Sequence, residues 1–252
     1  MDLGLEGRTV IVTGASGGIG REIARTFAAE GADVVLTYRK APEEAERVAK
    51  EIGGRTMVAP YDLADPAAAT ALVGAVLEWT GRVDVLINNA VHWGASAPSP
   101  DRSFEEVPDE EWLAVVRGNI EGSLRLARAV APVMRERRWG RMVHISSTLA
   151  VTGAAGSEYY TTAKAALHGF NRSVAHGLGR DGDILSNVVM PGFTRTERNV
   201  EMVERYGEHY GEAAPIKRLL DASEIATPVV FLGSAANTGI TGRVLAVDGG
   251  TS

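Results

Sequence analysis

The sequence contains no cysteine among its 252 residues, which excludes disulfides, thiol catalysis and thiolate metal sites. It has no uninterrupted apolar run of membrane-spanning length, and its N-terminus lacks the basic and apolar regions of a secretory signal. It also lacks an excess of positive charge. The net charge of −6 argues against a nucleic-acid or anionic-membrane surface as the main partner. These absences lead us to expect a cytoplasmic globular protein.

Short β-branched runs alternate with longer helical patterns along the chain. The runs that predict strands lie at 8–14, 33–38, 55–62, 83–90, 141–147, 185–192 and 242–250. Helices are expected between most of them, with Gly31 suited to follow the first helix and Pro42 suited to begin the second. This order predicts a single α/β domain over residues 1–252. We expect a Rossmann-like, doubly wound parallel sheet with helices on both faces.

A glycine cluster lies at the first strand-to-helix junction, in TGASGGIG (13–20). Gly14, Gly18 and Gly20 would permit a tight turn and the close approach of a pyrophosphate to the amides of a helix N-terminus. Their spacing, G-x-x-x-G-x-G, differs from the common dinucleotide spacing G-x-G-x-x-G. The position at the first β-to-α junction nevertheless favours a dinucleotide-binding loop over a simple turn.

Two adjacent tyrosines precede a lysine in GSEYYTTAK (156–164). The residues that follow place apolar side chains at a helical period, which predicts a helix here. Side chains four positions apart share one face of a helix, whereas those five apart do not. Tyr160, and not Tyr159, is therefore predicted to share a face with Lys164.

With these motifs the chain resembles the short-chain dehydrogenase/reductase family, in its classical subgroup. The resemblance covers essentially the whole chain, and the family's glycine motif has the spacing found here. The landmarks, in the family's order, are TGASGGIG (13–20), NNA (88–90), Asn119, Ser147, YTTAK (160–164), PGFTRT (191–196) and ITGRVLAVDGG (240–250).

The resemblance implies a catalytic group of Asn119, Ser147, Tyr160 and Lys164. Tyr160 would exchange a proton with the substrate oxygen, and we expect the lysine ammonium and an oxidised nicotinamide to lower its pKa from about 10. Ser147 would bind the substrate oxygen, while Ser146 is expected to face the other side of its strand. Asn119 would order a water that links Lys164 to solvent.

The resemblance also implies a nicotinamide dinucleotide. The residues expected to contact it are Gly14, Ser16, Gly18, Ile19, Gly20, Arg39, Asp62, Leu63, Asn89, Ala90, Tyr160, Lys164, Pro191, Gly192, Thr194 and Thr196. Thr196 and the backbone near Thr194 would hold the carboxamide, Asp62 would reach the adenine, and Asn89 and Ala90 would lie against the adenosine ribose.

The end of the second strand bears on the choice of cofactor. It has no carboxylate to reject a 2′-phosphate, and the Arg39 guanidinium could bind one, so NADP(H) is favoured over NAD(H). If Arg39 is only a solvated loop charge, the preference stays open. Asp33 has the spacing of a ribose-binding acid, but it begins the strand and so lies at the wrong end of the sheet.

Some positions depart from the family pattern. Val91 replaces the glycine that usually follows Asn-Asn-Ala, which predicts a changed local backbone. His92 and Trp93 are expected at the mouth of the site. They would either shape a pocket for a bulky substrate or, in the case of Trp93, pack the irregular stretch 91–111.

Two charged or metal-like features have simpler interpretations. The run RERRWGR (135–141) is interpreted as a solvated helix end, and docking of an acidic carrier protein is the alternative. No metal site is expected, because the candidate ligands lack a shared face or a carboxylate partner. These ligands are His144, His168 and His176.

The predicted function is an NADPH-dependent reductase that converts a ketone into a secondary alcohol, with Tyr160 as the proton donor. Within the family the chain most resembles 3-oxoacyl-carrier-protein reductases, which implies a β-ketoacyl thioester or polyketide-like substrate. The alternative is an alcohol, sugar or steroid dehydrogenase working oxidatively. A nucleotide-sensing regulator is disfavoured by the intact Ser-Tyr-Lys group, and an epimerase by the absence of an added C-terminal region.

We also expect a substrate lid at 193–218 and a homotetramer or dimer.

Overall fold

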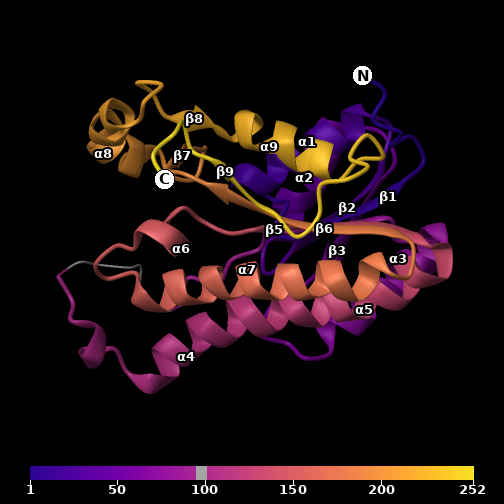
Figure 1. Ribbon diagram of the computed structural model, residues 1–252, viewed down its shortest axis with the longest axis horizontal. Helices are drawn as coiled ribbons and strands as arrows, with labels where there is room; N and C mark the ends of the chain where they lie inside the picture. The colour runs from indigo at the N-terminus through magenta and orange to yellow at the C-terminus, as the bar shows by residue number, and fades with distance from the viewer. Residues whose placement is uncertain (95–100) are drawn as a thin grey trace.

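The computed structural model describes residues 1–94 and 101–252. Its main sheet is parallel throughout, in the order β3-β2-β1-β4-β5-β6-β9 (Figure 1). The strands are β1 (Thr9–Val12), β2 (Asp33–Tyr38), β3 (Thr56–Pro60), β4 (Val85–Asn88), β5 (Trp139–Ile145), β6 (Asp183–Pro191) and β9 (Val244–Val247). A small second sheet pairs β7 (Thr194–Arg195) with β8 (Leu220–Asp221).

Helices cover both faces of the sheet, as the sequence predicts (Figure 1). One face carries α1 (Gly18–Ala29), α2 (Pro42–Ile52) and α9 (Ala222–Leu232). The other carries α3 (Ala68–Thr80), α5 (Ser123–Arg137) and α7 (Glu158–Gly179), with α4 (Asp109–Arg117) running into α5 through the π-helical turn η2 (Gly118–Gly122). The shorter elements are η1 (Phe104–Glu106) and α6 (Leu149–Thr152), and α8 (Val200–Ala213) follows β7.

The alternation of side chains along each strand divides the core in two. Val10 and Val12 of β1 pack with Phe27 of α1 and Val229 of α9. Ile11, between them, belongs to the second cluster, with side chains of α3, α5 and α7. Buried strands with near-continuous apolar runs are typical of a parallel sheet covered on both sides, which confirms the predicted fold.

The expected helix boundaries are also present. Gly31 has φ +80° just after the end of α1, a left-handed conformation that favours glycine. Pro42 is the first residue of α2, where its missing N–H leaves no helical hydrogen bond unmade. Asp33 begins β2 and pairs with Arg55 at 2.9 Å, so it lies at the amino edge of the sheet and away from the ligand side.

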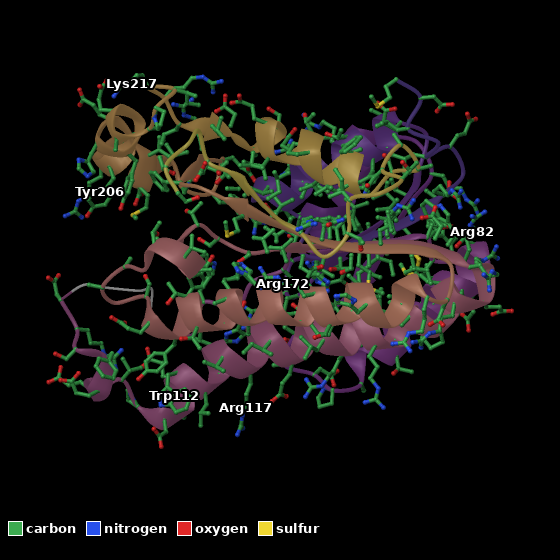
Figure 2. The ribbon with its side chains drawn as sticks, viewed as in Figure 1. Arg82, Trp112, Arg117, Arg172, Tyr206 and Lys217 are labelled. Carbon is green, nitrogen blue, oxygen red and sulfur yellow. The ribbon has the colours of Figure 1, made fainter. Side chains whose placement is uncertain are left out.

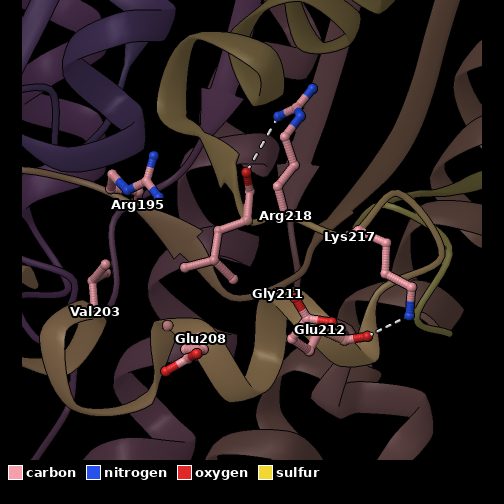
Figure 3. Close-up of a pocket in the computed structure, with 9 residues that line it drawn as sticks. Arg195, Val203, Glu208, Gly211, Glu212, Lys217 and Arg218 are labelled. Carbon is pink, nitrogen blue, oxygen red and sulfur yellow. Dashed lines mark hydrogen bonds between the residues drawn. The ribbon is translucent and has the colours of Figure 1, made fainter.

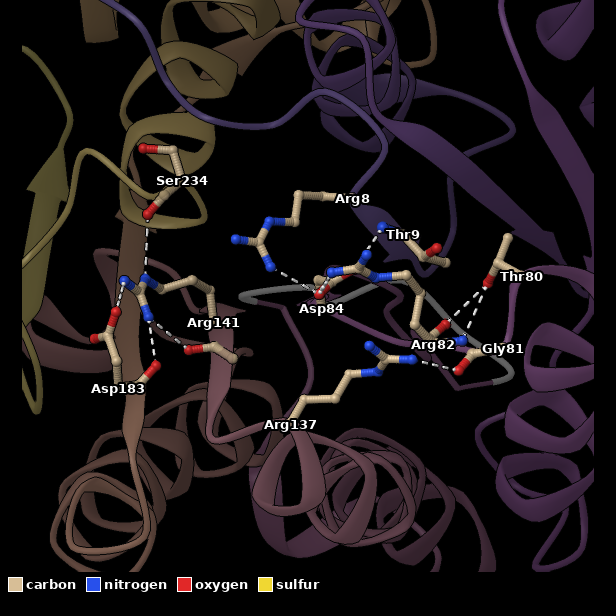
Figure 4. Close-up of polar contacts among 11 residues, drawn as sticks. Arg8, Thr9, Thr80, Gly81, Arg82, Asp84, Arg137, Arg141, Asp183 and Ser234 are labelled. Carbon is tan, nitrogen blue, oxygen red and sulfur yellow. Dashed lines mark hydrogen bonds and ion pairs between the residues drawn. The ribbon is translucent and has the colours of Figure 1, made fainter.

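A cluster of charged side chains ties the amino ends of the central strands together (Figure 4). The carboxylate of Asp84 is buried and accepts hydrogen bonds from Arg82 at 2.6 Å, Arg8 at 3.1 Å and the Thr9 amide at 2.8 Å. Because its oxygens are bonded by two guanidinium groups and an amide, this buried charge is compensated.

Residues 135–138 form the exposed end of α5 and its cap, as expected, but Arg141 of the same run is not solvated. Helix α5 ends at Arg137, and Arg141 lies in β5 with a fully buried side chain. Its guanidinium donates to the carbonyl oxygens of Ser234 at 3.1 Å and Asn237 at 2.9 Å, and to the Asp183 carboxylate at 2.9 Å (Figure 4). This arginine is part of the framework, so a carrier protein cannot dock on it.

The segments that follow the strands gather at one end of the molecule. Helix α6 follows β5, α8 follows β6 and β7, and the C-terminus follows β9 (Figure 1). Ligands of doubly wound sheets bind beyond these carboxyl ends, so the site is sought there. Among the helices of the described residues, none combines the length and apolarity needed to cross a membrane.

Candidate active site

The glycine loop forms a cradle that turns tightly at the first strand-to-helix junction, and Gly20 has no room for a side chain. Gly14 and Gly18 have φ values of +65° and +59°. A Cβ added to Gly20 would lie 2.4 Å from the Gly14 carbonyl oxygen and 2.5 Å from Nδ2 of Asn89. The loop leads into the N-terminus of α1, where amides without a helical partner favour an anion. This geometry fits the pyrophosphate of a dinucleotide.

Thr13 joins the cradle to the end of β4. Its Oγ1 accepts hydrogen bonds from the amides of Asn89 and Ala90, both at 2.9 Å, and Asn89 Nδ2 donates to the Thr13 carbonyl at 2.9 Å. The structure thus brings Asn89 and Ala90 against the glycine loop. Thr13 was not singled out from the sequence, although it is the first residue of TGASGGIG.

The end of β2 lies beside the same loop. Oγ1 of Thr37 accepts from the Gly14 amide at 3.1 Å, and Arg39 follows with an exposed side chain. Arg39 and Asp62 both act electrostatically on His92, whose pKa is lowered first by burial and then by the arginine charge. The residues expected around the adenosine therefore surround one region, at the ends of β2, β3 and β4.

Lys164 and Tyr160 lie on one face of α7, as the four-residue spacing predicts. The ammonium is 5.8 Å from the centroid of the Tyr160 ring, and Nζ donates to the Ile145 carbonyl at 2.8 Å. Burial lowers the pKa of Lys164 to about 8. Tyr159 points elsewhere: its hydroxyl donates to the Phe104 carbonyl at 2.8 Å and its ring stacks on Trp112.

Burial raises the pKa of Tyr160 to about 12, and a hydrogen bond with Ser147 only partly offsets this. In the chain alone, the loss of water around the phenol outweighs its polar contacts. The lowering expected from Lys164 and an oxidised nicotinamide together stays a prediction. The ring of Trp93 stacks on Tyr160 at a centroid distance of 4.8 Å and an angle of 20°. Trp93 therefore covers one face of the candidate catalytic group.

Ser147 follows the end of β5 and also accepts a hydrogen bond from the Leu149 amide at 3.3 Å. Its neighbour Ser146 is buried, and its hydroxyl donates to the Lys164 carbonyl at 3.1 Å and lies 2.8 Å from Nε2 of His168. The two serines thus face different sides, and only Ser147 contacts Tyr160.

Asn119 lies buried in the π-helical turn η2, a type of helix defect that is frequent at functional sites. Its Oδ1 accepts from the His92 amide at 3.0 Å, and its Nδ2 donates to the carbonyls of His92 at 2.7 Å and Val115 at 2.8 Å. Asn119 thereby holds the loop that carries Trp93. The water that it would order stays a prediction.

The segment after Pro191 and Gly192 crosses to the glycine loop. Thr194 is buried, and its hydroxyl donates to the Gly192 carbonyl at 2.9 Å. Thr196 lies close enough that its methyl group would be 4.0 Å from a Cβ on Gly18. The two threonines are therefore on the ligand side of the sheet.

Two further sequence interpretations concern His144 and the loop after Val91. His144 accepts a hydrogen bond from Asn88 at Nδ1, and burial lowers its pKa to about 4, so the ring is neutral. Across residues 1–94 and 101–252, no group of three or more potential ligands is arranged to hold a metal ion. Residues 95–100 of the stretch 91–111 lie outside the described residues.

A hollow of about 230 Å³ lies between α8 and the turn at 215–219 (Figure 3). Its lining includes Arg195, Glu208, Lys217 and Arg218, and among the described residues it shares none with the predicted site. Lys217 donates to the Glu212 carbonyl, and Arg218 to the Leu219 carbonyl, so these cations are already bonded within the segment (Figure 3). The hollow belongs to the packing of α8.

Together, the fold and the site define an oxidoreductase that uses a nicotinamide dinucleotide. Residues 14–252 match the family model described as "Enoyl-(Acyl carrier protein) reductase". The chain belongs to the short-chain dehydrogenase/reductase family, and it is an NAD(P)H-dependent oxidoreductase of that family.

Individual relatives cover nearly the whole chain. The 3-oxoacyl-[acyl-carrier-protein] reductase FabG of Escherichia coli is 35% identical, over 98% of this chain and 98% of that protein. An L-rhamnose 1-dehydrogenase (NAD(P)(+)) of Sphingomonas sp. is 36% identical, over 98% and 96%. A solved structure described as a short chain dehydrogenase/reductase family protein has 34% identity and a TM-score of 0.84, with 99% and 98% covered.

Proposed function

We propose that the protein reduces a ketone to a secondary alcohol with NADPH, and that Tyr160 donates the proton. The observation that carries the proposal is the meeting of Tyr160, Ser147 and Lys164 at the carboxyl end of the sheet. The glycine cradle, at the ends of β1 and β4, would hold the pyrophosphate. When bound, the nicotinamide supplies the hydride.

Tyr160, Ser147 and Lys164 would each have a separate role in the reaction. With a pKa of about 12, the Tyr160 phenol is neutral at physiological pH and is an acid ready to protonate an oxygen that gains negative charge. Ser147, beside that hydroxyl, would donate a hydrogen bond to the same oxygen. Lys164, fixed by the Ile145 carbonyl, would bind the ribose and keep positive charge near the phenolate that forms.

We propose NADPH as the cofactor, and not NADH, because of the residues at the end of β2. Arg39 is exposed there, and neither Thr37 nor Tyr38 supplies a carboxylate that would repel a 2′-phosphate. Arg39→Ala should weaken NADPH binding by roughly tenfold to a hundredfold and leave NADH nearly unchanged. Fluorescence titration of both cofactors measures this, and equal losses for the two would refute the assignment.

A substrate with an apolar portion is proposed from the rim of the site. Large exposed apolar side chains there include Trp93, Val151 of α6, and Val200 and Met202 of α8. Aromatic side chains of α4 and α8 lie at the same end of the molecule, as the labelled Trp112 and Tyr206 show (Figure 2). An apolar rim of this kind suits an acyl chain, so the first substrate class proposed is a β-ketoacyl thioester or polyketide-like ketone.

The 36% sequence identity with an L-rhamnose 1-dehydrogenase supports a second candidate function, which is oxidation of a sugar or alcohol by the same residues. Consumption of NADPH and NADH should be measured with β-ketoacyl thioesters, enoyl thioesters, cyclic ketones and sugars, together with the reverse reaction on alcohols. Reduction of the ketoacyl thioester supports the proposal. Turnover confined to sugars favours the second candidate, and turnover of the enoyl thioester alone contradicts the proposed reduction of a ketone.

Assembly through the C-terminal strand is part of the proposal. Strand β9 forms one edge of the sheet; Leu245 within it is 42% exposed, and Ile240 just before it is 41% exposed. Exposed apolar side chains beside an open strand edge favour pairing with a second copy. Light scattering should give the mass of a homotetramer or a dimer, whereas a monomer would contradict this part of the proposal.

A further inference from the structure

The start of the proposed lid lies directly on the glycine loop. The carboxylate of Glu197 accepts a hydrogen bond from the Gly18 amide at 2.7 Å. The next residue, Arg198, donates to the Ser16 hydroxyl at 3.2 Å and to the Glu44 carboxylate at 3.0 Å. A Cβ on Gly17 would lie 2.0 Å from Nε of Arg198, so the arginine packs directly on the glycine backbone and would have to shift if Gly17 were replaced.

The position of Glu197 has an electrostatic reason. Gly18 is the first residue of α1, and its amide is one of those that a helix leaves unbonded at its positive end. Within α1, which is described in full, the first turn has no acidic residue and the N-cap residue makes no side-chain hydrogen bond. The anion comes instead from a residue 179 positions away in the sequence.

The same amides are where a dinucleotide would place its pyrophosphate. Two anions cannot share one helix N-terminus without strong repulsion, so a bound cofactor and the Glu197 contact exclude each other. We propose that Glu197 is an internal competitor for the cofactor pyrophosphate. This inference rests on the proposed function, because it presumes that a nicotinamide dinucleotide binds here.

The contact links cofactor exchange to the lid. Thr196, predicted to bind the nicotinamide carboxamide, directly precedes Glu197, so release of Glu197 from Gly18 frees the backbone that must meet the cofactor. When the cofactor leaves, the carboxylate returns and the cradle closes. Glu197 therefore weakens cofactor binding, and we expect it to speed release of the oxidised cofactor.

Removing the charge of Glu197 should lower the dissociation constant of the cofactor by a factor equal to the reciprocal of the fraction of molecules in which the cradle is open. For a charge-assisted contact at a helix N-terminus we expect about a tenfold lower dissociation constant in Glu197→Gln. Glu197→Asp keeps the charge but is shorter by one methylene, and it should tighten binding as well. Glu201→Gln removes a charge from the first turn of α8 and is the matched control.

The dissociation constants of NADPH and ADP should be measured by calorimetry for the four proteins, with thermal unfolding as the test of folding. The inference predicts tighter binding of both ligands in Glu197→Gln and Glu197→Asp, and no change in Glu201→Gln. It is overturned if neither Glu197 variant changes the two constants, if binding weakens, or if Glu201→Gln gives the same gain. Wild-type protein that binds neither NADPH nor NADH would instead refute the proposed function.

Discussion

Replacing Lys164 by methionine should stabilise the protein near neutral pH, because the ammonium is buried. Its pKa is lowered from 10.5 to about 8 by burial. At about 1.4 kcal/mol per pKa unit, this difference means that burying the charged ammonium costs roughly 3 kcal/mol of folding free energy. The hydrogen bond to the Ile145 carbonyl, worth about 1–2 kcal/mol, opposes it. Lys164→Met should therefore raise the free energy of unfolding by roughly 1–2 kcal/mol.

The pH dependence is the sharper part of this prediction. A lysine whose pKa is lowered in the folded state destabilises that state below its folded pKa, and the penalty disappears as the pH rises from about 8 to 10.5. Between roughly pH 7.5 and pH 9.5, the free energy of unfolding of the wild type should therefore rise by about 2 kcal/mol relative to that of Lys164→Met. By the upper pH the advantage of the variant should be lost.

Urea unfolding of both proteins at several pH values measures this difference. Lys50→Met, which removes an exposed lysine of α2, is the control for general charge effects. A constant stability difference between wild type and Lys164→Met across this range would refute the reasoning, as would a variant that is less stable near neutral pH. Neither result depends on a bound cofactor.

Other variants test the framework and the site. Gly20→Ala should abolish NADPH binding in a titration, because its Cβ would lie 2.4 Å from the Gly14 carbonyl oxygen; retained binding would contradict the cradle. Arg141→Met should lower the free energy of unfolding by about 3–5 kcal/mol in urea, since it leaves several buried oxygens unbonded; a loss below about 1 kcal/mol would contradict that role. Trp93→Ala should lower the pKa of Tyr160 from about 12 towards 10, as the phenol gains water. Ultraviolet titration against Tyr160→Phe measures it, and an unchanged midpoint would show that Trp93 does not shield the ring.

Local pattern was enough to predict the parts of the site that one helix or one loop builds. The period of α7 selected Tyr160 over Tyr159, and the structure directs Tyr159 to Phe104 instead. The doubly wound parallel sheet also followed, because alternating strands and helices leave few topologies. Asp33 was placed correctly, since a strand has a known direction relative to the ligand side.

Contacts between distant segments could not be predicted in this way. Nothing near Glu197 indicates that its carboxylate meets Gly18, because the contact depends on the path of the chain after β6. Arg141 was expected to begin a strand, but the burial of its side chain was missed, because its partners, Ser234 and Asn237, are distant in the sequence. The burial of Tyr160 under Trp93 is likewise a tertiary effect that spacing does not encode.

The most direct test of the central claim is the rate of ketone reduction by Tyr160→Phe, which keeps the ring but removes the acidic hydroxyl. We predict that kcat falls by about a thousandfold, within the usual range for loss of a general acid, while NADPH binding and thermal unfolding stay close to wild type. A folded variant that binds NADPH and turns over at the wild-type rate would contradict the assignment of Tyr160 as the proton donor.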